Sequence, residues 1–332
     1  MMKLSAVKRV AETIDSEWKS PVAETILARW KYDKGTLFFY RVSSNFVFVF
    51  RKDGERHFLR FIETTERDVI TIKSEIGVLT YLNSHMKDVV NPVESVNGEY
   101  VEEVETQWGT FAAVVFKGIE GESYEVEVLN ENQFEHWGAS LGKLHQTLKS
   151  IPEDLIKTRS DWNDLLGFVR NNLSDREVAA SDELNLVNKW FHGMPVTREN
   201  FGLIHFDFEL DNLKFKGEKV GIYDFDDCIR CWYAGDIAFA LRDLFQNGID
   251  LSSKSFIAFM RGYKQETNVD QEMLNNLQWF IRLHNLITFA KLVHAVDLEQ
   301  STTYPEWLQA LPDKLMKKIE DYRVIFNERL SI

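Results

Sequence analysis

The hydrophobic pattern of this 332-residue chain changes once, from strand-like to helix-like, and that change restricts the fold class most strongly. In the first third, short aromatic and β-branched runs are typical of an antiparallel meander, with Asp53-Gly54 as a hairpin signal. The predicted strands lie at 36–42, 45–50, 57–62, 99–104 and 110–116, with helices at 4–18 and 67–86. From about residue 130 the pattern is mainly helical, with apolar stripes at 256–263, 274–298 and 307–326. We therefore expect an α+β chain with two lobes, a β-rich lobe at 1–117 and a mainly helical lobe at 118–332.

The composition excludes several classes of protein. With 44% hydrophobic residues, the chain can bury a sizeable core and is not disordered. Its 39 basic and 52 acidic residues give a net charge of −13, which disfavours nucleic-acid binding because phosphate neutralisation needs a basic stripe. No window approaches the roughly 18 uncharged apolar residues that a membrane helix requires. We expect a cytoplasmic protein with neither a nucleic-acid nor a membrane partner, and the sequence leaves the oligomeric state open.

One predicted β-hairpin interrupts the helical part. It spans 213–225, and Asp224 closes its second strand. Just before it, Asp207 and Asn212 are spaced as D-x-x-x-x-N. A tight loop followed by a hairpin can bring these three side chains to one point. Phosphoryl transfer from ATP requires such a set, because one group orients and deprotonates the accepting hydroxyl while oxygen ligands hold Mg²⁺ against the phosphates.

Three short motifs occur in order around these residues: His205-Phe206-Asp207 with Asn212, then 222–227, then Gly235-Asp236-Ile237-Ala238. Together they resemble the aminoglycoside phosphotransferase and choline kinase-like family, which has the protein-kinase fold. Its patterns are H-G-D-x-x-x-x-N, a strand ending I-D-F/W-D/E, and a helix opening D-L-A. The resemblance implies an ATP- and Mg²⁺-dependent phosphotransferase that acts on a hydroxyl of a small molecule. It further implies that Asp207 is the catalytic residue and that Asn212 and Asp224 bind the metal.

The resemblance extends into the β-rich lobe. The run 45–50 is similar to the nucleotide-covering hairpin of the family, which places Ser44 and Asn45 at the nucleotide. Arg60 is similar to the basic residue that contacts phosphate, and Glu75 to its partner carboxylate. Phe116 would lie near adenine, at the strand end before the connector. The helices after residue 245 would shape the acceptor pocket.

The sequence departs from the family pattern at three positions. Phe206 stands where the family usually has glycine, so we expect a φ angle there that is not comfortably positive. The loop Ser43-Ser44-Asn45 has no glycine, which makes backbone amide contacts to phosphate less assured. Arg60 replaces the commoner lysine and changes the geometry of the cation. Because the carboxylates remain, an active enzyme is favoured over an inactive one.

Other readings stay open at this stage. A protein Ser/Thr kinase is one, although 224–236 is too short for a long activation segment; a nucleotide-binding pseudokinase is another. Arg60 and Glu75 could form an ordinary surface pair. His205 is expected to orient its loop and Asp236 to act as a helix N-cap. The pair Cys228 and Cys231 supplies only two ligands and is interpreted as incidental.

Four further carboxylates lie close in sequence to Asp207, at Glu209, Asp211, Asp226 and Asp227. A cluster of this kind would attract a cation through its field. The narrower expectation is therefore an acceptor that bears an amine. The alternative is that these carboxylates face solvent, or in the case of Asp226 and Asp227 assist the metal, and say nothing about the acceptor.

Overall fold

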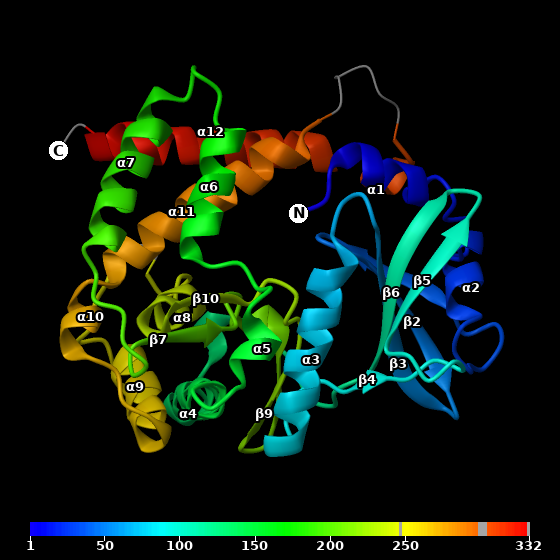
Figure 1. Cartoon of the computed structure of the whole chain (residues 1–332), viewed down its shortest axis with the longest axis horizontal. Coiled ribbons are helices and arrows are strands. Elements are labelled where there is room, and N and C mark those ends of the chain that lie inside the picture. The colour runs from blue at the N-terminus through cyan, green and yellow to red at the C-terminus, as the bar shows by residue number, and fades with distance from the viewer. Residues whose placement is uncertain (246–247, 298–303, 331–332) are drawn as a thin grey trace.

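The computed structural model describes residues 1–245, 248–297 and 304–330. The first lobe is built on an antiparallel sheet in the order β1-β2-β3-β6-β4, with β5 also paired to β6. Its strands are β1 (Phe38–Val42), β2 (Phe46–Lys52), β3 (Glu55–Glu63), β4 (Pro92–Val93), β5 (Val101–Thr106) and β6 (Gly109–Lys117). The helices are α1 (Leu4–Ala11), α2 (Pro21–Leu27) and α3 (Val69–His85). In Figure 1, α3 stands between this sheet and the helical part of the molecule.

Side-chain alternation explains the sheet. In β2, Phe46, Phe48 and Phe50 are all buried on one face, as expected for a strand with a period of two. Phe46 and Phe48 stack on Phe61 of the neighbouring β3 with ring centroids 5.3 and 5.7 Å apart. The predicted strands are therefore present, with shifts of a few residues at their ends.

The predicted helix at 4–18 is wrong in its second half, because α1 ends at Ala11. The Asp15 carboxylate accepts hydrogen bonds from the backbone N–H groups of Glu17 and Lys19, at 2.9 Å each. This local turn competes with a helix for the same backbone donors. Trp18 then adopts a positive φ of 63°, which ends any helical path.

The second lobe is mainly helical and contains two small antiparallel strand pairs, β7 with β10 and β8 with β9. Its helices are η1 (Val126–Val128), α4 (Glu131–Leu148), α5 (Glu153–Ile156), α6 (Trp162–Asn172), α7 (Val178–His192), η2 (Leu210–Asn212), α8 (Tyr233–Ala240), α9 (Lys254–Glu266), α10 (Gln271–Asn275), α11 (Leu277–Ala295), η3 (Glu306–Leu308) and α12 (Leu311–Leu330). Its strands are β7 (Phe201–Ile204), β8 (Leu213–Lys216), β9 (Lys219–Ile222) and β10 (Ile229–Trp232). The apolar stripe predicted at 274–298 divides into α10 and α11 at Asn276, and residue 298 lies outside the described residues.

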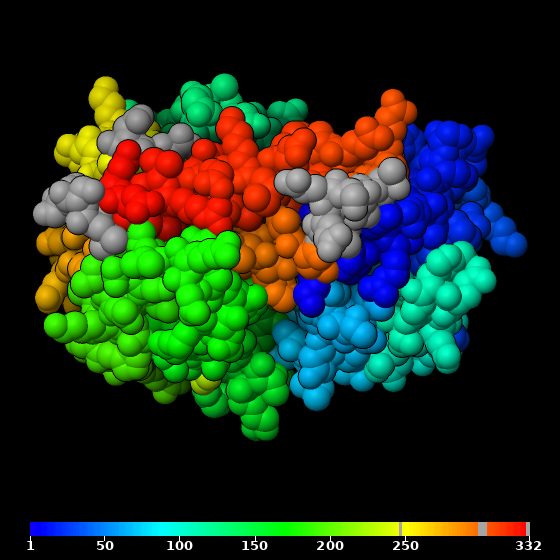
Figure 2. All heavy atoms as spheres, turned by 90° about the horizontal axis from the view of Figure 1, so that it is seen from above, coloured from blue at the N-terminus to red at the C-terminus, as the bar shows by residue number. Residues whose placement is uncertain are grey.

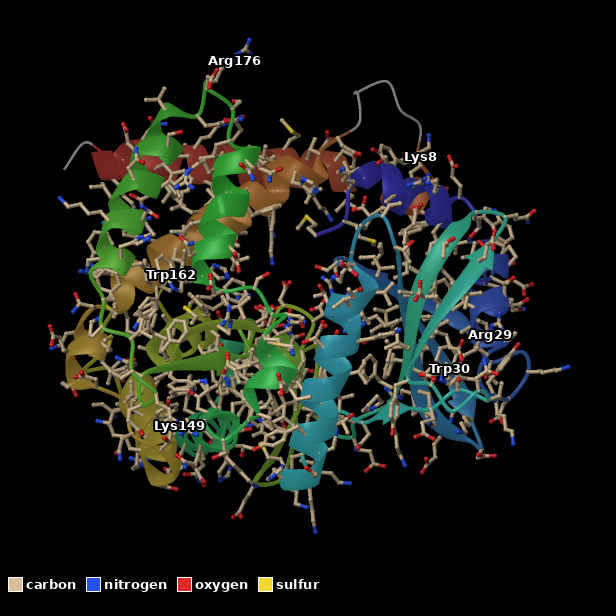
Figure 3. All side chains as sticks on the ribbon, viewed as in Figure 1. Lys8, Arg29, Trp30, Lys149, Trp162 and Arg176 are labelled. Atoms are coloured by element: carbon tan, nitrogen blue, oxygen red, sulfur yellow. The ribbon has the colours of Figure 1, made fainter. Side chains whose placement is uncertain are left out.

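Glycines permit the closest helix contact in this lobe, between α4 and α9. A Cβ atom at Gly138 would overlap the carbonyl group of Phe259, and one at Gly262 would overlap that of Glu135. Aromatic rings pack in both lobes, and Figure 3 labels the buried Trp30 and the partly buried Trp162. Trp30 donates from Nε1 to the carbonyl of Val93 at 2.9 Å, whereas Trp162 packs on other rings of the helical lobe. The buried apolar side chains of the two lobes belong to one continuous core.

The α+β architecture with a sheet-based and a helical half is confirmed. The last strand of the large sheet ends at Lys117, and the division into 1–117 and 118–332 stays a prediction. The C-terminal part also returns to the sheet, since the Trp307 ring lies 5.0 Å from Phe39 and 5.9 Å from Trp18. In Figure 2, an orange segment of the C-terminal part lies against the blue N-terminal part of the chain. Among the described helices, none has the length and apolar character to cross a membrane.

Candidate active site

The loop between β7 and β8 contains the predicted catalytic residue. The short η2 turn brings Asn212 back toward Asp207, and its Nδ2 donates to Asp207 Oδ2 at 2.9 Å and to the Asp207 carbonyl at 3.0 Å. Arg242, just after α8, donates from Nη1 to Asp207 Oδ1 at 3.2 Å. The two predicted residues are therefore adjacent, and both oxygens of the carboxylate are held in place. Asp207 keeps a partly exposed side chain that a substrate can reach.

A fully buried carboxylate fixes the shape of this loop. Asp236 accepts from the backbone N–H of His205 through Oδ2 and from that of Phe206 through Oδ1, both at 2.8 Å. His145 contacts Asp236 Oδ2 as well, through Nε2 at 2.9 Å. The predicted N-cap role is wrong, because Asp236 lies in the first turn of α8 and Trp232 is at the N-cap. The Asp236 carboxylate accepts hydrogen bonds from backbone N–H groups of the loop, about 30 residues earlier in the chain, and not from those of its own helix.

Phe206 contradicts the expectation about its backbone, since its φ is +71°. A left-handed conformation costs a non-glycine residue about 1–2 kcal/mol. The hydrogen bond to Asp236 holds the backbone, and the buried ring packs 5.0 Å from Phe239 and 5.9 Å from His284. His205 is held too, with Nε2 3.1 Å from the carbonyl of Tyr223, which agrees with a loop-orienting role. Tertiary contacts thus override the local preference at Phe206.

Replacing Phe206 by glycine is expected to destabilise the protein in spite of the better φ. Relief of the backbone strain returns about 1–2 kcal/mol, whereas loss of a buried phenyl ring costs about 3–5 kcal/mol. The free energy of unfolding, measured by urea denaturation, should therefore fall by about 1–4 kcal/mol. Phe206→Leu, which keeps most of the packing and the positive φ, is the control and should lose less. A glycine variant as stable as wild type would contradict this account.

Asp224 follows β9, which ends at Ile222, so the carboxylate lies beyond the strand rather than on it. Its φ is +69°, a conformation that aspartate tolerates better than most residues. Arg41 Nη2 lies 2.8 Å from Asp224 Oδ2, and Arg60 Nη1 lies 3.7 Å from Oδ1. Burial and the neighbouring Asp226 carboxylate nevertheless raise the pKa of Asp224 to about 8. A cation bound next to Asp224 would therefore stabilise the charged form of its carboxylate.

Arg60 and Glu75 form the predicted pair between β3 and α3, with Arg60 Nη2 2.6 Å from Glu75 Oε2. Both side chains are buried, so the alternative of an ordinary surface pair is excluded. Burial opposes the charge on Arg60, but Glu75 and Asp226 outweigh it and raise the pKa of Arg60. Within the described part of the chain, Glu75 Oε1 has no hydrogen-bond partner. The pair thus leaves one carboxylate oxygen available beside the cavity that it lines.

Asp226 is buried and Asp227 partly buried, and both carboxylates are paired with cations. Asp226 Oδ2 accepts from Asn45 Nδ2 at 2.7 Å and from Arg67 Nη1 at 2.8 Å. Burial raises the pKa of Asp226, but the two arginines Arg67 and Arg60 outweigh burial and lower it. Asp227 Oδ2 accepts from Lys291 Nζ at 2.7 Å. Asn45 thereby ties the β1–β2 hairpin to the segment after Asp224.

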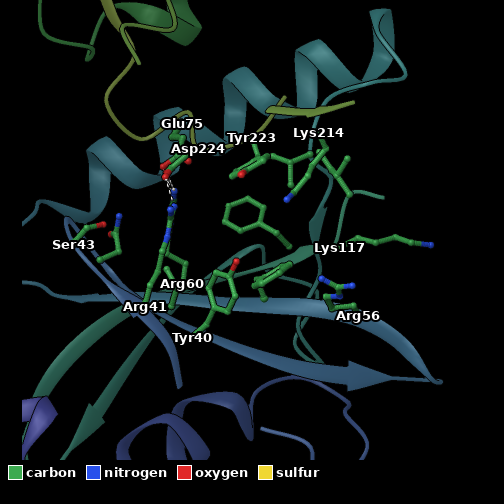
Figure 4. Close-up of a pocket in the computed structure, with 16 residues that line it drawn as sticks. Tyr40, Arg41, Ser43, Arg56, Arg60, Glu75, Lys117, Lys214, Tyr223 and Asp224 are labelled. Carbon is green, nitrogen blue, oxygen red and sulfur yellow. Dashed lines mark hydrogen bonds and ion pairs between the residues drawn. The ribbon is translucent and has the colours of Figure 1, made fainter. Parts of the chain in front are cut away.

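Arg41, Arg60 and Asp224 line a cavity between the lobes (Figure 4), whereas Asp207 and Asn212 are not part of its lining. Its lining includes four of the predicted nucleotide-binding residues but not Ser44, whose neighbour Ser43 lines it instead. One end is charged, where Arg41 and Arg60 reach from the sheet toward Asp224 and Glu75. The rest of the lining is largely apolar and aromatic, with Tyr40, Phe58, Val90, Phe116, Ile119 and Tyr223, and the basic residues Arg56, Lys117 and Lys214 line the side away from Asp224. Aromatic rings beside a charged end suit a nucleotide, which has a flat ring and phosphates.

Sequence reasoning missed Arg41, Arg242 and Lys291. Each of these cations pairs with a carboxylate of the motif region, at Asp224, Glu209 and Asp227 respectively. No spacing links the partners, which are 183 residues apart for Arg41 and Asp224. The carboxylates near Asp207 are consequently less negative as a group than the sequence suggests.

The two cysteines on and beside β10 are both buried and reduced. Burial raises the pKa of Cys228 to about 12 and that of Cys231 further, which disfavours the thiolate that metal binding and redox chemistry require. Among the described residues, no group of three His, Cys, Asp or Glu side chains could hold a metal by itself. A metal ion at Asn212 and Asp224 would need substrate oxygens to complete its shell, which is the usual arrangement for Mg²⁺.

The fold and the site together define a two-lobed, kinase-like phosphotransferase. The model of the phosphotransferase enzyme family (APH) matches residues 41–268, which is more than half of the chain. The chain therefore belongs to this family, as the sequence motifs predicted. It is an ATP-dependent phosphotransferase whose acceptor is a hydroxyl group of a small molecule.

Individual relatives agree with this assignment. The amicoumacin kinase of Bacillus subtilis (strain 168) is 24% identical over 282 residues, covering 82% of this chain and 84% of that protein. A structure of an amicoumacin kinase with AMP-PNP and Ca²⁺ superposes with a TM-score of 0.74 at 23% identity, over 90% of this chain and 92% of that one. A microcompartment-associated aminopropanol kinase has a TM-score of 0.69 at 18% identity, over 93% and 97% of the two chains. These structures share the fold of this chain.

Proposed function

We propose that this phosphotransferase uses Asp207 to align the acceptor hydroxyl and to take its proton, with Mg-ATP bound between the lobes. The strongest support is one arrangement. Asp207 and Asn212 are hydrogen-bonded to each other, and Asp224 lines a cavity that also contains Arg41, Arg60 and several aromatic rings. Arg242 and Asn212 orient the Asp207 carboxylate from both sides, so that its remaining lone pairs face the acceptor.

Asn212 and Asp224 would hold the Mg²⁺ ion. The amide nitrogen of Asn212 is engaged by Asp207, which leaves its oxygen as a ligand, and Asp224 supplies a carboxylate. When bound, the ion would neutralise charge on the phosphates of ATP. Arg60, fixed by Glu75, would add a permanent positive charge beside Asp224. These donors fit Mg²⁺, which binds through one or two protein oxygens plus phosphates and water.

The acceptor class is the finer part of the proposal. We propose an amine-bearing alcohol as the acceptor. The carboxylate cluster near Asp207 attracts a cation less than its sequence suggests, because Glu209, Asp226 and Asp227 are paired with cations. The likeness to an aminopropanol kinase supports an acceptor of this class. A location in the cytoplasm, where ATP is abundant, is proposed as well.

A screen of small alcohols for ATP-dependent phosphorylation tests the function directly. Amino alcohols, aminosugars, hydroxy acids and neutral alcohols should be compared, with Asp207→Asn as the blank. Transfer to an amine-bearing alcohol is expected to exceed transfer to the others. Greater activity on a neutral or anionic alcohol would overturn the acceptor proposal, and transfer to none of them would overturn the wider one.

Replacing Asp224 by alanine is expected to abolish the stabilisation that Mg-ATP provides. The variant lacks the one carboxylate proposed at the metal, so Mg²⁺ can no longer bridge the protein and the phosphates. Melting temperature with and without Mg-ATP is the measurement. Asp211→Ala is the matched control, because Asp211 is an exposed carboxylate of the same region and its contact to Tyr223 uses the backbone carbonyl. An unchanged Mg-ATP shift in Asp224→Ala would refute the metal role.

A further inference from the structure

Arg41 occupies an unusual position at the charged end of the cavity. It extends from β1 and ends with Nη2 2.8 Å from Asp224 Oδ2. Its side chain is 39% exposed, whereas that of Arg60 is 8% exposed. Arg60 already has a partner in Glu75, at 2.6 Å. Among the described residues, Asp224 is the only carboxylate that forms an ion pair with Arg41.

The backbone of β1 is built to direct Arg41 into the cavity. Successive residues of a regular strand point to opposite faces, so Arg41 would share the face of Phe39. The pairing with β2 shifts register between these two residues, from Phe39 opposite Phe48 to Arg41 opposite Val47. Tyr40 and Arg41 consequently both line the cavity, while the partly buried Phe39 packs on Phe48 of the core. Bulges that redirect a side chain are frequent beside active sites.

The loop next to Arg41 provides few other groups for phosphate. Ser43-Ser44-Asn45 contains no glycine, and the side-chain Nδ2 of Asn45 donates a hydrogen bond to Asp226. A metal ion at Asp224 would replace the charge that Arg41 provides to this carboxylate. The guanidinium would then be a cation without a partner near the place proposed for the phosphates of the nucleotide. Its fork of donors suits phosphate oxygens.

We propose that Arg41 binds the phosphates of the nucleotide and exchanges partners when it does so, from Asp224 in the empty cavity to phosphate oxygens in the complex. The inference rests on the proposed role of Asp224. It adds a second basic residue to the phosphate site, from a strand position that none of the sequence motifs includes.

Calorimetric binding of ADP and of adenosine, each with Mg²⁺, tests the proposal without any acceptor. In Arg41→Gln, ADP should bind roughly 10- to 100-fold more weakly, the effect of losing a charge-assisted hydrogen bond, while adenosine affinity is unchanged. Arg41→Lys should recover part of the ADP affinity, because the charge returns without the fork. Arg51→Gln is the matched control; this exposed arginine of β2 donates to the Gly54 carbonyl, outside the cavity, and both affinities should stay at wild-type values.

Two results would overturn the proposal. If Arg41 only neutralises Asp224, ADP will bind Arg41→Gln as tightly as wild type. If the substitution merely damages the cavity, adenosine and ADP will weaken equally. Failure of the proposed function is distinguishable, because it would appear as no transfer to any acceptor by the wild-type protein, whatever the ratio of ADP to adenosine affinity.

Discussion

Asp207→Asn is expected to slow phosphoryl transfer by about 10²–10⁴-fold, the usual effect of removing a general base or positioning group. The amide has nearly the shape of the carboxylate but cannot take the hydroxyl proton. It also has one acceptor oxygen where wild type has two, whereas Asn212 and Arg242 both donate to this side chain. One of these donors will lose its partner, and the orientation of the side chain will be less fixed.

Nucleotide binding should survive this substitution, because Asp207 does not line the cavity between the lobes. Steady-state transfer rates and ADP affinity should be measured side by side. Asp211→Asn makes the same chemical change at an exposed neighbour and should keep both. Wild-type turnover in Asp207→Asn would end the assignment of this residue, and a parallel loss of ADP affinity would mean that the substitution disturbs the whole site.

Asp236→Ala is expected to give the largest loss of stability, about 3–5 kcal/mol in the free energy of unfolding, as when one partner of a buried charged network is removed. Three buried groups lose their partner at once: the backbone N–H groups of His205 and Phe206, and Nε2 of His145. The positive φ of Phe206 also loses the hydrogen bond that holds it. Transfer activity should fall with stability, since the loop then no longer places Asp207.

Urea unfolding measures the loss in the free energy of unfolding. The transfer activity of the protein that remains folded measures how far the loop still places Asp207. Asp182→Ala removes an exposed carboxylate of α7 and should change stability by less than about 0.5 kcal/mol. Asp236→Asn should lie between wild type and Asp236→Ala, because one amide oxygen can accept from only part of the set. Near-wild-type stability of Asp236→Ala would show that the loop does not depend on this carboxylate.

Patterns within a few residues were sufficient for most of the fold. Alternating phenylalanines predicted β2, a helical apolar stripe predicted α3, and the turn residues predicted the β8–β9 hairpin. The order of the motifs from His205 to Asp236 indicated the family, and with it a site made of Asp207, Asn212 and Asp224. The strand and helix predictions succeed because such an element buries one face at a fixed period, which the sequence displays directly, whereas the roles of the three site residues stay a prediction.

Other features depend on partners that are far away in the chain. The left-handed Phe206 is held by Asp236 and by two aromatic neighbours, and so its own preference did not decide its backbone. Arg41 and Asp224 are 183 residues apart in the sequence, and a bulge in β1 that no local pattern predicts directs Arg41 toward Asp224. Glu209, Asp226 and Asp227 looked like free negative charge in the sequence, yet each has a cation beside it in the folded protein. Local periodicity determines which elements form, whereas the pairing of buried charges is settled only when those elements pack together, because an ion pair depends on distances that the fold alone sets.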